Sequence, residues 1–150
     1  MKEKLINFFR IFLPIILGGI VGFLIKDAID YQNLVQPPLA PPKIVFPIFW
    51  SILYILIGIS YYLYRKENDN TLEIFVYYAQ LILNLSWTII FFILKLRLLS
   101  IFIILFIIIL VLYLIIKFWH QKRISAYLLI PYIIWLIFAL YLNVGIFILN

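Results

Sequence analysis

Residues Leu98 to Trp119 read LLSIFIILFIIILVLYLIIKFW, an apolar run that contains no amide and no acidic side chain. At 1.5 Å per residue, a helix over this run is about 33 Å long, enough to cross the roughly 30 Å hydrocarbon core of a bilayer. Ile, Leu and Phe occupy nearly every position from Leu98 to Ile116. We therefore expect a transmembrane helix that forms a wall facing lipid.

The composition of the whole chain supports the same interpretation. Its 150 residues are 67% hydrophobic and 12% charged, whereas a soluble domain is about half apolar and about one quarter charged. Four further runs are long enough to span a membrane: Phe8 to Ile25, Ile44 to Tyr64, Leu72 to Leu94 and Ala126 to Leu149. We predict an all-α integral membrane protein, with one domain over residues 1–150 folded as a five-transmembrane-helix bundle.

The first run follows basic residues, as the apolar part of a secretion signal does. No pair of small residues that would mark a cleavage site follows it at Lys26 to Ala28. We therefore expect a retained transmembrane helix. Pro14 lies inside this helix and should kink it.

Lysine and arginine are divided unequally between the two ends of the predicted spans. Eight lie on the N-terminal side and four on the other, and cytoplasmic segments carry the excess of these residues. The eight are Lys2, Lys4, Arg10, Arg65, Lys66, Lys117, Lys122 and Arg123. We predict a cytoplasmic N-terminus and a C-terminus outside. The excess of lysine over arginine and the many isoleucines indicate a bacterial cell membrane.

The chain lacks the residues that several kinds of catalytic or metal-binding site require. The chain has no cysteine and one histidine, His120, so we expect no metal site and no thiol nucleophile. Asp27, Asp30, Glu67 and Glu73 all lie at the ends of spans, which leaves no acid/base pair inside the membrane. The net charge of +6 is divided among short clusters between spans, so we expect no nucleic-acid partner. We also expect no cofactor.

Three spans carry aromatic and amide residues at helical spacing. The stripes are Phe46, Trp50, Tyr54, Gly58 and Tyr61 in the second span, Gln80, Asn84, Trp87 and Phe91 in the third, and Pro131, Trp135, Ala139, Asn143 and Phe147 in the fifth. We expect the stripes to meet in the outer half of the bundle, beneath a proline-rich first loop at residues 26–43 that covers a small-molecule pocket. The alternative is that the aromatics anchor the helices at the interface and the amides bond helices together.

The first span contains Gly18 and Gly22, a pair at G-x-x-x-G spacing. Such pairs let another helix approach closely. We interpret them as packing residues, within the bundle or between protomers.

Motifs in three regions resemble the TspO/MBR family, the tryptophan-rich sensory proteins related to the mitochondrial translocator protein. They are Pro37-x-x-x-Pro41-Pro42-x-x-Val45-Phe46-Pro47-x-x-Trp50-x-x-Leu53-Tyr54-x-x-x-Gly58, Tyr78-x-Gln80-Leu81-x-Leu83-Asn84-x-x-Trp87-x-x-x-Phe91-Phe92 and Pro131-Tyr132-x-x-Trp135-x-x-Phe138-Ala139-x-x-Leu142-Asn143. The chain departs from the family pattern at Asp30, where the family often has tryptophan, and at Gln36, where it often has lysine.

The resemblance implies a five-helix bundle, commonly a homodimer, that binds porphyrins and benzodiazepine-type drugs under the first loop and serves in sensing or transport. By motif position its ligand-binding residues are Tyr31, Pro42, Phe46, Trp50, Tyr54, Asn84, Trp87, Trp135 and Ala139. The spacing of the stripes adds Gln80 and Asn143 to the predicted pocket.

Two other functions remain open at this point. The resemblance to bacterial family members implies light-dependent oxidative degradation of protoporphyrin, with Trp50 and Trp135 as redox partners. The third hypothesis is a regulatory membrane partner protein that acts by helix contacts through the face of Gly18 and Gly22.

Overall fold

The computed structural model describes residues 1–150 as five long helices and one short 3-10 turn. The helices are α1 (Lys2–Ile25), α2 (Val45–Arg65), α3 (Thr71–Phe92), α4 (Arg97–Gln121) and α5 (Arg123–Leu149), and the 3-10 turn η1 covers Tyr31–Asn33. Each long helix is long and apolar enough to cross a membrane. The predicted all-α, five-helix membrane fold is therefore confirmed.

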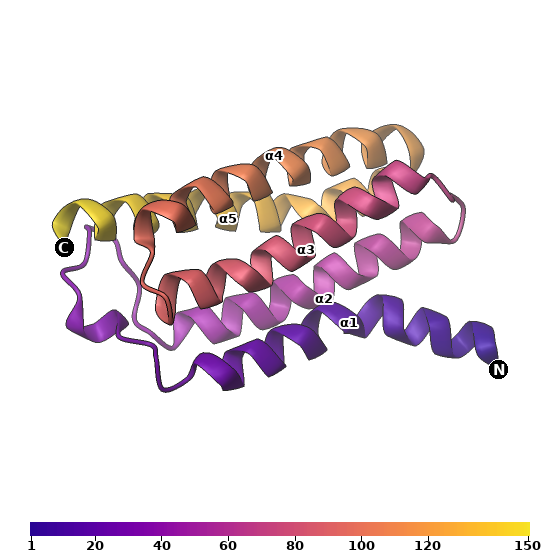
Figure 1. Ribbon diagram of the computed structural model, residues 1–150. Coiled ribbons are helices and arrows are strands. Elements are labelled where there is room, and N and C mark those ends of the chain that lie inside the picture. The colour runs from indigo at the N-terminus through magenta and orange to yellow at the C-terminus, as the bar shows by residue number, and fades with distance from the viewer.

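The five helices form a closed ring. Each has its main contacts with two neighbours, in the order α1, α2, α5, α4, α3 and back to α1. Figure 1 shows the two termini at opposite ends of the bundle and the first loop beside the C-terminus. We call the end that carries residues 26–43 the loop end.

The helix boundaries differ from the predicted ones at the start of α1 and at the junction of α4 and α5. α1 begins at Lys2 rather than Phe8, because the polar residues before the apolar run are good helix formers and Glu3 lies in the first turn, where an acidic side chain is favourable. The predicted break from His120 to Ser125 is almost entirely helical. Lys122 alone leaves the helical conformation, with φ −150° and ψ 84°, and its carbonyl accepts the Ser125 N–H at 2.9 Å.

The wall predicted for α4 is correct for one face only. Ile104, Ile107, Val111 and Leu114 are buried against neighbouring helices, whereas residues such as Phe106 are exposed. A helix that is apolar on every side carries no periodic signal for the buried face, so hydropathy could not distinguish the two.

α1 and α2 come together most closely away from the loop end. A Cβ placed on Gly58 would lie 1.8 Å from the Ile11 carbonyl oxygen, so only glycine fits at this crossing. One helical turn or so nearer the loop end, a Cβ on Gly18 would lie 2.3 Å from the Tyr54 ring. Pro14 lies inside α1 between these two contacts, and Figure 1 shows α1 bent near its middle.

Candidate functional site

A cavity of about 660 Å³ lies at the loop end, between α1, α2, α3, α5 and the first loop. Seven aromatic side chains line it: Tyr31, Phe46, Trp50, Tyr54, Trp87, Phe91 and Phe92. Lys43 is the single charged residue of the lining. The volume and the apolar, aromatic lining fall within the range of small-molecule binding sites, which is about 300–1,000 Å³.

Trp50 lies at the centre of the aromatic cluster. Its ring stacks on Tyr54 with centroids 5.4 Å apart and lies 6.4 Å from Trp87. Trp135 meets it edge-on at 6.4 Å, with an interplanar angle of 88°. Flat rings therefore approach Trp50 from three helices, and aromatic pairs in such arrangements stabilise one another beyond their buried area.

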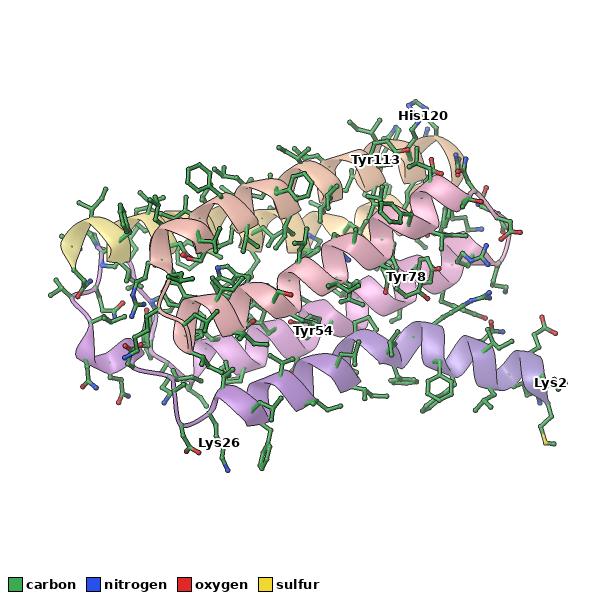
Figure 2. All side chains as sticks on the ribbon, in the orientation of Figure 1. Lys2, Lys26, Tyr54, Tyr78, Tyr113 and His120 are labelled. Carbon is green, nitrogen blue, oxygen red and sulfur yellow. The ribbon has the colours of Figure 1, made fainter.

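A hydrogen-bonded network closes the cavity away from the loop end. The Tyr54 hydroxyl donates to Asn84 Oδ1 at 2.7 Å, and Asn84 Nδ2 donates to the Tyr132 hydroxyl at 2.9 Å. That hydroxyl donates in turn to Gln80 Oε1 at 2.8 Å. Tyr54 is thereby fixed between the cavity and the network, and Figure 2 shows it near the middle of the bundle, well away from both ends.

Seven of the eleven residues predicted to bind ligand line the cavity: Tyr31, Phe46, Trp50, Tyr54, Trp87, Ala139 and Asn143. The other four are not among the residues that line the cavity. Gln80 and Asn84 are buried in the network behind Tyr54. Trp135 stacks on Phe49 with centroids 4.7 Å apart and packs against the edge of Trp50. Pro42 is exposed on the first loop.

The contribution of α1 to the lining was missed by sequence reasoning. Gly18, Gly19 and Gly22 all line the cavity. A Cβ on Gly18 would lie 2.3 Å from the Tyr54 ring, whereas a Cβ on Gly22 would have no neighbouring heavy atom within 4 Å. The glycine cluster was the available signal, but its spacing does not distinguish a helix contact from a cavity wall.

Polar groups are few among the residues that line the cavity, and one of them has no protein partner. The Nε1 of Trp87 is buried and makes no hydrogen bond within the protein. Asn143, by contrast, accepts from the Ser100 hydroxyl at 2.7 Å. A buried donor without a partner is unfavourable, but Trp87 Nε1 has almost no accessible surface and does not face the open cavity, so Trp87 contributes its ring to the lining.

The first loop is fixed over the cavity by contacts with α5. Asn150 donates from Nδ2 to the Val35 carbonyl and accepts at Oδ1 from the Val35 N–H, both at 3.0 Å. Pro37 is buried against Gly145, where a Cβ would lie 2.6 Å from Pro37 Cβ. The proline-rich segment therefore lies against the end of α5.

The beginning of the loop is fixed by charge. Asp30 forms ion pairs with Arg97 at 3.2 Å and Lys95 at 3.5 Å, both near the start of α4. Gln36 donates from Nε2 to the Tyr31 carbonyl. The Tyr31 hydroxyl donates to the Pro41 carbonyl at 2.9 Å, and burial raises the pKa of this phenol, which keeps it protonated as a donor. The departures from the family pattern at Asp30 and Gln36 thus stabilise the loop itself.

Comparison with known proteins accounts for this architecture. A sequence model of the TspO/MBR family matches residues 10–149, which include every residue that lines the cavity. The chain is 35% identical over 123 residues to the tryptophan-rich protein TspO of Archaeoglobus fulgidus, a match that covers 80% of this chain and 79% of that protein.

Two further relatives match over similar lengths. The translocator protein homolog of Schizosaccharomyces pombe is 31% identical over 144 residues, covering 92% of this chain and 88% of that protein. The tryptophan-rich sensory protein of Cereibacter sphaeroides is 30% identical over 122 residues, covering 81% and 77%. With the five-helix ring and the matched motifs, these similarities show that the chain belongs to the TspO/MBR family.

Proposed function

We propose that the protein binds flat, largely apolar ligands of the porphyrin and benzodiazepine types in the cavity beneath the first loop, and that this binding serves sensing or transport. The observation that carries the proposal is a cavity of about 660 Å³ with seven aromatic side chains and one cation in its lining. The relatives named translocator and sensory proteins support the same two roles.

The lining supplies one interaction for each part of a tetrapyrrole. The flat macrocycle can stack against Trp50 or Trp87, since aromatic faces prefer offset stacking. Lys43 can pair with a carboxylate. The sparse polarity favours a ligand that is mostly ring and carries few charged groups.

The proposal predicts that protoporphyrin quenches the tryptophan fluorescence of the purified protein in a saturable titration. Trp50→Leu should weaken the affinity about tenfold or more, because it removes the ring at the centre of the cluster. A benzodiazepine should compete with protoporphyrin for the same cavity. An unquenched wild-type protein, or a Trp50→Leu variant that binds as the wild type does, would contradict the proposal.

Trp119 offers a matched control for this titration. It lies in the last turns of α4, about 33 Å along the helix from Arg97, and its ring packs against Tyr127 at 5.1 Å. Trp119→Phe should leave the affinity unchanged. It should also increase the fraction of emission that is quenched, since the three tryptophans that remain all belong to the aromatic cluster.

A second candidate function is light-dependent oxidative degradation of bound protoporphyrin, with dioxygen as the oxidant. The proximity of Trp50 to Trp135 and Trp87 favours it, because electron-rich rings surround any ring bound against Trp50. Illuminated protein should then consume protoporphyrin faster than detergent alone does, and Trp50→Phe should slow the loss. Equal rates with and without protein would contradict this activity while leaving ligand binding intact.

A further inference from the structure

We propose that ligand enters the cavity sideways from the lipid, through a gap between α1 and α2 at the loop end. The gap is framed by Gly19 and Gly22 on α1 and by Pro47 and Ser51 on α2. The inference rests on the proposed binding function and adds the route, and with it the class of ligand: an amphiphile dissolved in the membrane.

The exposed residues of the cavity lining mark the gap. Six lining residues are exposed, and five of them lie on α1 or at the start of α2: Gly19, Gly22, Ile44, Pro47 and Ser51. The sixth, Gln32, lies in the first loop. Lining residues on α3 and α5 are buried or half-buried. The cavity therefore reaches the surface chiefly along one pair of helices.

The glycines show how α1 and α2 separate. A Cβ on Gly58 would lie 1.8 Å from a backbone oxygen of α1, and one on Gly18 would lie 2.3 Å from Tyr54. Further toward the loop end, a Cβ on Gly19 or Gly22 would have no heavy atom within 4 Å. The two helices are thus in contact at Gly58 and diverge toward the loop, with the smallest possible side chains on the α1 side of the opening.

The first loop is held in place over the water-facing end of the cavity. Asn150 holds Val35 through two hydrogen bonds, and Asp30 is paired with Arg97 and Lys95. These contacts tie the loop to α5 and to the start of α4. None of them ties it to α1, so movement of α1 relative to α2 leaves the loop contacts intact.

The chemistry of the gap suits a ligand that arrives with its apolar part first. Glycine and proline present no charge, and the Ser51 hydroxyl is already satisfied by the Pro47 carbonyl at 2.7 Å. Lys43 lies at the loop-end margin of the cavity, and Figure 2 shows Lys26 at the loop end of α1. A flat amphiphile can therefore slide its ring between the helices while its acidic groups stay at the level of the lipid headgroups.

The test uses engineered cysteines, because the chain has none of its own. Gly22→Cys and Ser51→Cys are combined and joined by a flexible bis-maleimide in protein reconstituted into lipid nanodiscs, with protoporphyrin as the probe. We expect cross-linking before ligand addition to slow association by at least about tenfold. We expect cross-linking after loading to slow release to a similar extent, so that the probe is trapped.

The matched control joins the loop to α5 through Val35→Cys and Asn150→Cys, at positions that already touch. This lock should change neither rate. If the loop lock slows binding and the gap lock does not, ligand enters past the loop and the lateral route is wrong. If neither lock changes the rates of a protein that binds protoporphyrin, the route is also wrong. A protein that does not bind protoporphyrin at all, before any cross-link, contradicts the proposed function itself.

Discussion

Gly58→Leu is expected to lower the free energy of unfolding by about 3 kcal/mol, near the upper end of the usual cost of overpacking. The reason is geometric. The first carbon of any side chain at this position would lie 1.8 Å from the Ile11 carbonyl oxygen and 2.7 Å from the carbonyl carbon. These are backbone atoms of α1, which no rotamer change can move aside, so the whole of α1 must shift away from α2. Thermal unfolding in detergent, followed by circular dichroism, measures the loss.

Gly19→Leu is the matched control for this substitution. Gly19 lies on the neighbouring helix, and a Cβ there would meet no heavy atom within 4 Å. Leucine at this position should therefore leave stability unchanged or raise it by up to about 1 kcal/mol, since glycine is a poor helix former. Equal midpoints for Gly58→Leu and the wild type would mean that α1 does not cross α2 at Gly58.

The existence of the five helices could be predicted because each span carries its own signal in hydropathy and length. Two predicted details were wrong, the start of α5 and the lipid-facing character of α4, and both depend on other parts of the folded chain. α5 begins directly after Lys122, although the segment is polar, because a single residue outside the helical conformation is enough to reverse the chain. Which face of α4 is buried depends on where α3 and α5 lie. A run of Ile and Leu that is apolar on every side does not indicate the positions of these neighbours.

The aromatic character of the cavity could be predicted from the sequence, but the set of residues that line it could be predicted only in part. Trp87 and Asn84 share a face of α3, yet only Trp87 reaches the cavity. The space in front of Asn84 is filled by hydroxyls from Tyr54 and Tyr132, which come from two other helices. Helical spacing places residues on a face, but the side chains that stand before that face belong to distant parts of the chain.

The role of Asp30 shows the same limit in the loop. From sequence it was only a departure from the family pattern, where an aromatic residue is common. Its partners, Arg97 and Lys95, are more than sixty positions away in the chain and meet it only because the α3–α4 connection lies beside the first loop. The ion pairs that Asp30 forms in the folded chain therefore could not be predicted from the sequence alone.

Tyr132→Phe is expected to destabilise the bundle by about 2 kcal/mol. Its hydroxyl accepts from Asn84 and donates to Gln80, and all three side chains are at most 2% exposed. Phenylalanine keeps the ring and removes the partner of two buried atoms, Asn84 Nδ2 and Gln80 Oε1. A buried polar group left unpaired costs about 1–3 kcal/mol, whereas measured interhelical hydrogen bonds within membranes average about 0.6 kcal/mol. The midpoint of thermal unfolding in detergent measures the effect.

Tyr127→Phe controls for the loss of a hydroxyl as such, because Tyr127 lies on the same helix and is 55% exposed, and it should change stability by no more than about 0.5 kcal/mol. A sharper test removes the whole network. Tyr54→Phe, Gln80→Leu, Asn84→Leu and Tyr132→Phe together leave no orphaned partner, so the combined variant should be more stable than Tyr132→Phe alone. If the combined variant is less stable than Tyr132→Phe, the hydrogen bonds between α2, α3 and α5 themselves stabilise the bundle. The cost of unpaired groups would then not be the main cause of the loss in Tyr132→Phe. If Tyr132→Phe matches Tyr127→Phe, the network does not hold the three helices together.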